Sequence, residues 1–208
     1  NAATYTSFSA DNLTLSDTNY SISTSGSTVN ATINAQALTG SITAPNKTYD
    51  GTTTATPTVS ITSGLIGTET VTATGTATFN AKDVLTASTV TLNTVSLSDG
   101  TNGGLASNYS LPTGIFTSAA INAKALSASV TATKTYDGAT TATPTVSITS
   151  GLIGTETVTA TGTATFNGKD VLTANTVTLN TVSLADGSNG GLASNYSLAS
   201  GLTGSGSV

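Results

Sequence analysis

The pentapeptide KTYDG occurs twice and places an amine, a phenol and a carboxylate next to one another. One copy starts at Lys47 and the other at Lys134. A buried, neutral lysine is a nucleophile, because burial lowers the pKa of the amine. The same residues also suit a structural corner, in which Tyr packs, Asp caps the turn and Gly takes a positive φ. We favour the corner, whose residues are Lys47, Tyr49, Asp50, Gly51, Lys134, Tyr136, Asp137 and Gly138.

An amide cross-link between lysine and asparagine is the chemical alternative for this motif. Lys47, with Glu69 on a neighbouring strand and an asparagine such as Asn108, has the required composition. Such a bond would be a covalent cross-link that stabilises a chain without cysteines for disulfides. Each link would release one ammonia, so the intact mass of the denatured chain tests it. In the corner interpretation the lysine is instead solvated or paired with the Asp of its own motif.

Two glycine-rich segments, SDGTNGG and ADGSNGG, are similar to oxygen-rich calcium loops. Each offers a single carboxylate, Asp99 or Asp186, whereas calcium sites usually gather several hard oxygen ligands. We therefore interpret both segments as turns, keep the two Asp residues as metal candidates only, and expect no cofactor. The sequence also holds Asn-x-Ser/Thr sequons, which are candidate glycosylation sites. They begin at Asn12, Asn19, Asn30, Asn46, Asn108 and Asn195.

The composition excludes several classes of function. The chain has 208 residues, of which only 7% are charged, and it contains neither His nor Cys. Catalytic pairs of Ser with His or Cys with His are therefore impossible, and we do not expect an enzyme. The five Lys+Arg residues are scattered, so no basic patch is available for nucleic acid. The apolar runs are too short for a transmembrane helix, and we expect no membrane insertion.

An internal repeat organises the chain. The two KTYDG lysines are 134 − 47 = 87 residues apart, and the same offset relates the two copies of PTVSITSGLIGTETVTATGTATFN and of NGGLASNYSL. A degenerate third piece precedes them. The repeat predicts three domains: 1–37, the end of a preceding repeat; 38–124, a first full repeat; and 125–208, a second one. Residues 1–18 match the repeat poorly.

Strict alternation of threonine with apolar residues predicts β-strands. In ETVTATGTATF the residues from Val71 to Phe79 at every second position share one face, and threonines occupy the other. Val90 and Leu92 have one phase, but Val95 and Leu97 have the opposite one, which predicts a bulge near residues 93–94. A single strand is expected over 115–123, and one helical turn over 104–109. We also expect Ile66, Leu85 and other large apolar residues in the core, and no aromatic platform outside it.

The fold class expected from these elements is all-β, as tandem immunoglobulin-like β-sandwich repeats in an elongated array. The alternative is a small β-grasp-like domain, although that fold needs a crossing helix. Domains of this size bury a limited core, so contacts between neighbouring repeats would add stability.

The repeats resemble the YDG-type repeats of large secreted bacterial surface adhesins, which are similar to filamentous haemagglutinins. The resemblance is carried by four motifs that occur in order: KTYDGTT, TATF, NYSL and INAKAL. The resemblance covers about residues 33–208. It implies an extracellular location on the bacterial cell surface and a structural role.

Three functions follow as hypotheses. The first is a stalk or spacer in an extracellular bacterial adhesin, which projects a binding tip or forms a fibre. The second is a self-assembling extracellular filament, joined by strand complementation through the N-terminal segment. The third is direct ligand binding, for example of a glycan. The expected partners are neighbouring repeats or further copies of the chain, while host or biofilm glycans would be bound by other parts of the parent protein.

Overall fold

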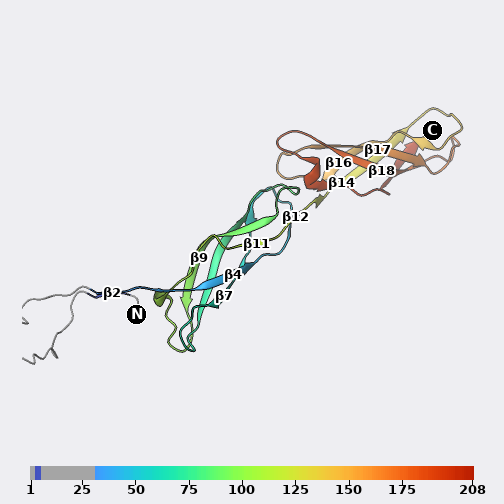
Figure 1. The fold of residues 1–208 in the computed structure, drawn as a ribbon. Coiled ribbons are helices and arrows are strands. Elements are labelled where there is room, and N and C mark those ends of the chain that lie inside the picture. Colours follow the sequence, from blue (N-terminus) through green and yellow to red (C-terminus); the bar gives the residue numbers. More distant parts are fainter. Residues whose placement is uncertain (1–2, 6–30) are drawn as a thin grey trace, which may run out of the picture. The chain divides into compact units, whose positions relative to one another are not determined.

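The computed structural model describes residues 3–5 and 31–208, and this part of the chain is all-β (Figure 1). Helix is limited there to two single turns, η1 (Ala106–Asn108) and η2 (Ala193–Asn195). Neither turn approaches the length or apolarity that a membrane-crossing helix needs. The all-β class and the helical turn predicted within 104–109 are both confirmed.

The strands follow the 87-residue repeat. Up to the second KTYDG motif they are β1 (Ala3–Tyr5), β2 (Ala31–Ile33), β3 (Gln36–Ala37), β4 (Thr39–Thr43), β5 (Lys47–Thr48), β6 (Thr54–Ala55), β7 (Thr58–Ser63), β8 (Val71–Phe79), β9 (Thr89–Asp99), β10 (Tyr109–Ser110), β11 (Phe116–Ser118), β12 (Ile121–Asn122), β13 (Lys124–Ala125) and β14 (Ser127–Thr133). The later ones are β15 (Thr141–Ala142), β16 (Thr145–Ser150), β17 (Val158–Phe166), β18 (Thr176–Asp186), β19 (Tyr196–Ser197) and β20 (Thr203–Ser207).

Threonine alternation produces the expected strands. In β8, Val71, Ala77 and Phe79 are buried, and the threonines that alternate with them are mostly exposed. The identical sequence in β17 has the same burial pattern. Threonine is β-branched and suits the exposed face of a pleated strand. Its hydroxyl groups make this face polar without charged residues.

The predicted bulge is present where the alternation changes phase. In the second repeat Thr163 of β17 pairs with Thr181 of β18, but the next residue, Ala164, pairs with Leu179. Asn180 is therefore the extra residue, and it is the counterpart of Asn93. The Thr163 amide donates a hydrogen bond to Thr181 Oγ1 at 3.2 Å, beside the bulge.

The strands assemble into open sheets. The first repeat has a four-stranded sheet of order β11-β9-β8-β6 and a separate pair, β4-β7. The second repeat has one six-stranded sheet of order β15-β17-β18-β20-β14-β16. The difference comes from β20, which pairs with β18 antiparallel and with β14 parallel. A Cβ added to Gly204 of β20 would lie 1.7 Å from the Val130 carbonyl oxygen, so only glycine permits this approach.

The chain divides into two compact units, each with its own core. Unit 1 comprises 1–43, 57–77 and 91–116, and its buried cluster is Leu38, Val71, Tyr109 and Leu111. Unit 2 comprises 44–56, 78–90 and 117–208. Its buried cluster is Val130, Ala132, Ala164, Phe166, Ala174, Val177 and Leu179.

The single strand expected over 115–123 is wrong, because this segment divides into β11, β12 and the start of a linker to β13. Within unit 2, β12 pairs parallel with β5, and Ile121 lies opposite Lys47. Two residues later β13 pairs parallel with β19, and Lys124 lies opposite Tyr196. The segment thus leaves a ladder of the first repeat and enters a ladder of the second.

Some large apolar residues expected in the core are exposed. Leu85 is at the tip of a loop, and Ile66 lies in a tight turn with 57% of its surface exposed. Two aromatic residues, Phe116 and Tyr136, are also exposed, although the KTYDG tyrosine was expected in the core of each repeat. Tyr136 is the more informative case, because its counterpart Tyr49 is fully buried.

Candidate functional site: a joint between consecutive repeats

The KTYDG lysine closes the corner that follows it. Lys47 Nζ lies 2.8 Å from Asp50 Oδ1, 2.8 Å from the Thr52 carbonyl oxygen and 3.0 Å from that of Thr54. Asp50 Oδ1 also accepts a hydrogen bond from the Thr52 amide at 2.9 Å, which forms the turn, and Gly51 has a φ of +78°. The ammonium group is therefore occupied in binding backbone carbonyls of the same corner.

The second copy of the corner has the same construction. Lys134 Nζ pairs with Asp137 Oδ1 and lies 2.7 Å from the Ala139 carbonyl oxygen and 3.1 Å from that of Thr141. Gly138 has a φ of +79°. In both copies the lysine therefore has the same role: it binds the Asp of its own motif and two backbone carbonyl oxygens, and so stabilises the turn.

Tyr49 extends from its corner to residues of the second repeat. Its side chain is 1% exposed, and its hydroxyl donates a hydrogen bond to Glu156 Oε1 at 2.8 Å. The ring packs edge-on against Tyr196, with centroids 5.5 Å apart. Tyr196 donates to the other oxygen of the same carboxylate, Glu156 Oε2, at 2.6 Å. One glutamate therefore binds a tyrosine from each repeat.

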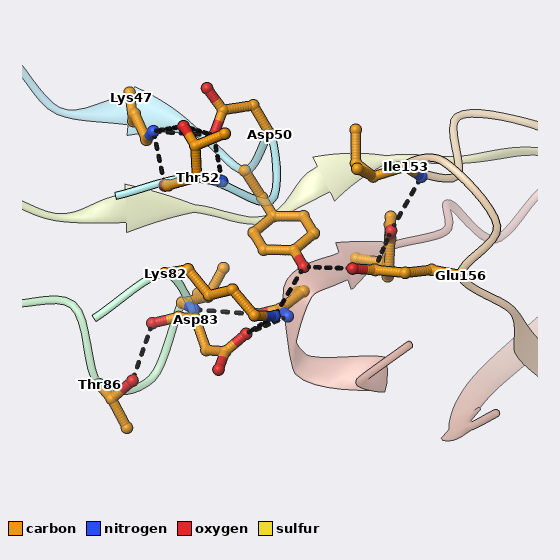
Figure 2. A network of polar contacts seen from close by, with 12 residues as sticks. Lys47, Asp50, Thr52, Lys82, Asp83, Thr86, Ile153 and Glu156 are labelled. Carbon is orange, nitrogen blue, oxygen red and sulfur yellow. Dashed lines mark hydrogen bonds and ion pairs between the residues drawn. The ribbon is translucent and has the colours of Figure 1, made fainter. Parts of the chain in front are cut away.

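A loop of the first repeat completes these contacts. Lys82 Nζ donates to the Tyr49 hydroxyl at 3.3 Å and pairs with Asp83 at 2.9 Å. Asp83 Oδ1 accepts a hydrogen bond from Asn195 Nδ2 at 2.8 Å, and the Val84 amide donates to Asn195 Oδ1 at 2.9 Å. Asn195 is 0% exposed, and both ends of its amide are satisfied, as burial requires. Figure 2 shows Lys82 and Asp83 on one side of the contact and Glu156 on the other.

We call this set the joint; its members are Tyr49, Lys82, Asp83, Val84, Glu156, Asn195 and Tyr196. All of them belong to unit 2. The residues that form it come from the corner and loop of the first repeat and from a turn, η2 and the start of β19 of the second.

Short-range bonds hold each contributing segment in place. Asn80 Oδ1 accepts from the Ser88 and Thr89 amides at 2.9 and 3.1 Å, which closes the loop that carries Lys82 and Asp83. On the other side the Ile153 amide donates to the Tyr196 hydroxyl at 3.1 Å, and this bond fixes the turn that presents Glu156. These bonds restrict the loops from within each repeat, and such restriction lowers the conformational entropy lost when the joint forms.

The electrostatics of the joint favour neutral tyrosines and a charged lysine. Burial, followed by the hydrogen bond to Glu156, raises the pKa of Tyr49. The same two causes raise the pKa of Tyr196 to about 12. The hydrogen bond to Asp83 raises the pKa of Lys82. Burial acts to raise the pKa of Asp83, but hydrogen bonds from Asn195 and Lys82 outweigh it and lower that pKa.

Comparison with known proteins places the repeats in a family. The YDG domain model matches residues 34–116 and 122–203, which together are most of the chain. The chain belongs to the YDG domain family. Neither the comparison with curated proteins nor that with solved structures finds a match. The joint therefore links two consecutive YDG domains, and the YDG tyrosine of the first is its central residue. The exact domain boundaries stay a prediction.

The residues proposed for a cross-link bind other partners. In the second YDG domain, Lys134 pairs with Asp137, Glu156 binds Tyr196 and Tyr49, and Asn195 binds Asp83. In the first, Lys47 binds Asp50, while Glu69 accepts a hydrogen bond from Tyr109. Both sets of contacts give the YDG lysine and the glutamate separate structural roles.

The calcium-like loops act as packing loops. Asp99 Oδ1 accepts from the Ala106 amide, and Asp186 Oδ1 from the Ala193 amide, each at 2.7 Å, so each carboxylate holds the start of a helical turn. A Cβ on Gly104 would lie 1.9 Å from the Thr70 carbonyl oxygen, which explains the glycine. Within the described residues no group of three or more potential metal ligands of the His, Cys, Asp or Glu type occurs.

The sequons lie in different environments. Asn12, Asn19 and Asn30 are outside the described residues. Asn46 is exposed, and its Oδ1 accepts from the Ala120 amide at 2.8 Å, while Asn108 is half-buried in η1. Asn195 is buried in the joint, so a glycan could be attached there only while the joint is open.

Sequence reasoning missed Lys82, Asp83, Glu156 and Asn195 as members of one site. The hydrogen bonds that join the first repeat to the second span 107 to 112 positions, as between Tyr49 and Glu156 or Asp83 and Asn195, so no local pattern indicates them. One signal was present. In a chain with 7% charged residues, the few charges recur at the same places in both repeats, and such recurrence indicates a shared structural task.

Proposed function

We propose that the chain is a stalk or spacer segment of an extracellular bacterial adhesin, built from tandem immunoglobulin-like sandwich domains of the YDG family. In this role each domain adds length, and the joint sets the angle between consecutive domains. A receptor or a glycan is bound by another part of the parent protein. The absence of His and Cys removes the Ser-His and Cys-His catalytic pairs, which supports a structural role.

The observation that carries the proposal is the burial of the YDG tyrosine by the following domain. A flexible tether would leave Tyr49 in water, as Tyr136 is left, with 53% of its surface exposed. Instead the ring is buried, its hydroxyl binds Glu156, and the neighbouring loop binds Asn195. Contacts of this kind restrict movement between the corner of one repeat and the repeat that follows, and such restraint supports a spacer role.

The extracellular location is supported by composition. The chain has no Cys and no Met, the two residues most readily oxidised outside the cell. The resemblance to repeats of secreted adhesins agrees with this. Surface labelling of intact cells that produce the parent protein tests the location: protected repeats would contradict it.

Small-angle scattering of the 208-residue chain at low concentration tests the spacer role. We expect an elongated monomer, and a compact particle would contradict the proposal. Tyr49→Ala should broaden the distribution of dimensions, because it removes the central residue of the joint. Tyr136→Ala is the matched control, since it changes the same motif at an exposed site and should leave the distribution unchanged.

A further inference from the structure

The two repeats are nearly identical in sequence, so a residue that is buried in one copy and exposed in the other marks a surface that a neighbour covers. Tyr49 is 1% exposed and Tyr136 is 53% exposed. A Cβ added to Gly51 would lie 3.1 Å from Ile153 Cγ2, whereas one added to Gly138 would meet nothing within 4 Å. The corner of the second repeat therefore presents the surface that the joint covers in the first.

The loop beside this corner shows the same difference. Lys169 and Asp170 pair with each other at 2.7 Å, and the following residue, Val171, is exposed. Their counterparts Lys82 and Asp83 make the same pair but also bind Tyr49 and Asn195. Among the residues that the structure describes, Tyr136 has no hydrogen-bond partner. We call this surface the Tyr end; it comprises Tyr136, Gly138, Lys169, Asp170 and Val171.

The first repeat carries the complementary surface, which we call the Glu end; it comprises Ile66, Glu69 and Tyr109. Tyr109 donates to Glu69 Oε2, and the Ile66 amide donates to the Tyr109 hydroxyl at 3.2 Å. These two bonds match the bonds of Tyr196 to Glu156 and Ile153 inside the joint. The Glu69 carboxylate is thus held by Tyr109, and its second oxygen, Oε1, is the counterpart of the Glu156 oxygen that accepts the hydrogen bond from Tyr49 in the joint.

We propose that the Tyr end of one copy of the chain binds the Glu end of a second copy, so that Tyr136 donates to Glu69 as Tyr49 donates to Glu156 within the chain. The contact joins two different surfaces. Copies therefore add head to tail, and the assembly stays open unless the rotation between successive copies closes it into a ring. The inference rests on the joint that also supports the proposed spacer function, and it extends that joint to contacts between molecules.

The internal joint sets the concentration at which this contact should be seen. A short linker gives two domains an effective concentration of roughly millimolar. Contacts that stay formed inside the chain under that condition should also form between separate copies at about millimolar concentration or below. Association should thus be weak, reversible and absent at low micromolar concentration.

Sedimentation equilibrium of the full chain, from low micromolar to about millimolar concentration, tests the proposal. The average mass of the wild type should rise continuously with concentration. Tyr136→Ala and Glu69→Ala should each lower the association constant by about tenfold or more, because each removes one side of a hydrogen bond to a charged group. Glu69→Gln, which keeps an acceptor for Tyr109, provides a milder variant should Glu69→Ala fold poorly.

Mixing the two alanine variants gives the decisive result. Tyr136→Ala retains an intact Glu end, and Glu69→Ala retains an intact Tyr end, so an equal mixture should form dimers and nothing larger. A wild type that stays monomeric throughout, a Tyr136→Ala variant that associates like the wild type, or a mixture that forms long oligomers would each overturn the proposal. A monomeric wild type that is elongated in scattering would leave the spacer function standing, so the two failures are distinguishable.

Discussion

The same substitution at two copies of one motif measures what the joint contributes to stability. Tyr49→Ala removes a buried ring, its edge-on contact with Tyr196 and its hydrogen bond to Glu156. Truncation of a buried aromatic side chain costs about 3–5 kcal/mol, so we expect a loss of about 3 kcal/mol or more in the free energy of unfolding. Tyr136→Ala removes a ring that is 53% exposed, and substitutions at such sites usually change stability by about 0.5 kcal/mol.

Urea unfolding followed by circular dichroism compares the two variants with the wild type. Both remove the tyrosine of a KTYDG motif, so effects on the unfolded chain largely cancel. In thermal unfolding the same difference corresponds to a melting temperature about 6–12 °C lower for Tyr49→Ala, given about 2–4 °C per kcal/mol at this chain length. Equal losses in the two variants would refute the reasoning, because they would show that the tyrosine acts only within its own corner.

Three further outcomes follow from the same contacts. Asn195→Ala should lower the free energy of unfolding by about 2 kcal/mol in urea, because the Asp83 carboxylate and a backbone amide lose their buried partner; an unchanged midpoint would contradict the contact. The pKa of Tyr49 is raised above 10.0 and that of Tyr196 to about 12, so their contribution to stability is complete below pH 10.0 and is lost as the pH rises toward 12; urea midpoints that stay constant over this range would contradict the burial of both phenols. The denatured chain should have the mass of its sequence, since both KTYDG lysines are bound within their own corners; a deficit of one ammonia or more would reveal a cross-link.

Local pattern was sufficient to predict much of the fold. The period of two in the threonine-rich segments determines which face of β8 is buried, and the phase change after Leu92 locates the bulge seen at Asn180. Such features depend on neighbours one or two positions apart, which the sequence displays directly. The division of residues 115–123 was not visible, because it depends on β12 and β13 pairing with strands of different repeats.

The joint could be predicted only in part. The KTYDG corner follows from residue types, since an Asp-Gly turn and a nearby lysine suffice. The partners of Tyr49 in the second repeat lie more than 100 positions away, and nothing in the corner indicates that its tyrosine contacts another domain. The two copies of the motif have the same sequence but differ in exposure, because the ring of Tyr49 is buried and the ring of Tyr136 is exposed. The difference therefore comes from the neighbouring domain and not from the motif.

A double-mutant cycle between Tyr49 and Glu156 tests the central claim, that the YDG tyrosine of one domain binds the next domain. The wild type, Tyr49→Phe, Glu156→Gln and the double variant give the coupling energy from four free energies of unfolding, and Tyr136→Phe replaces Tyr49→Phe in the control cycle. The joint predicts a coupling of about 1 kcal/mol or more for Tyr49 with Glu156, and additivity within about 0.5 kcal/mol for Tyr136 with Glu156. Additivity in both cycles would contradict it.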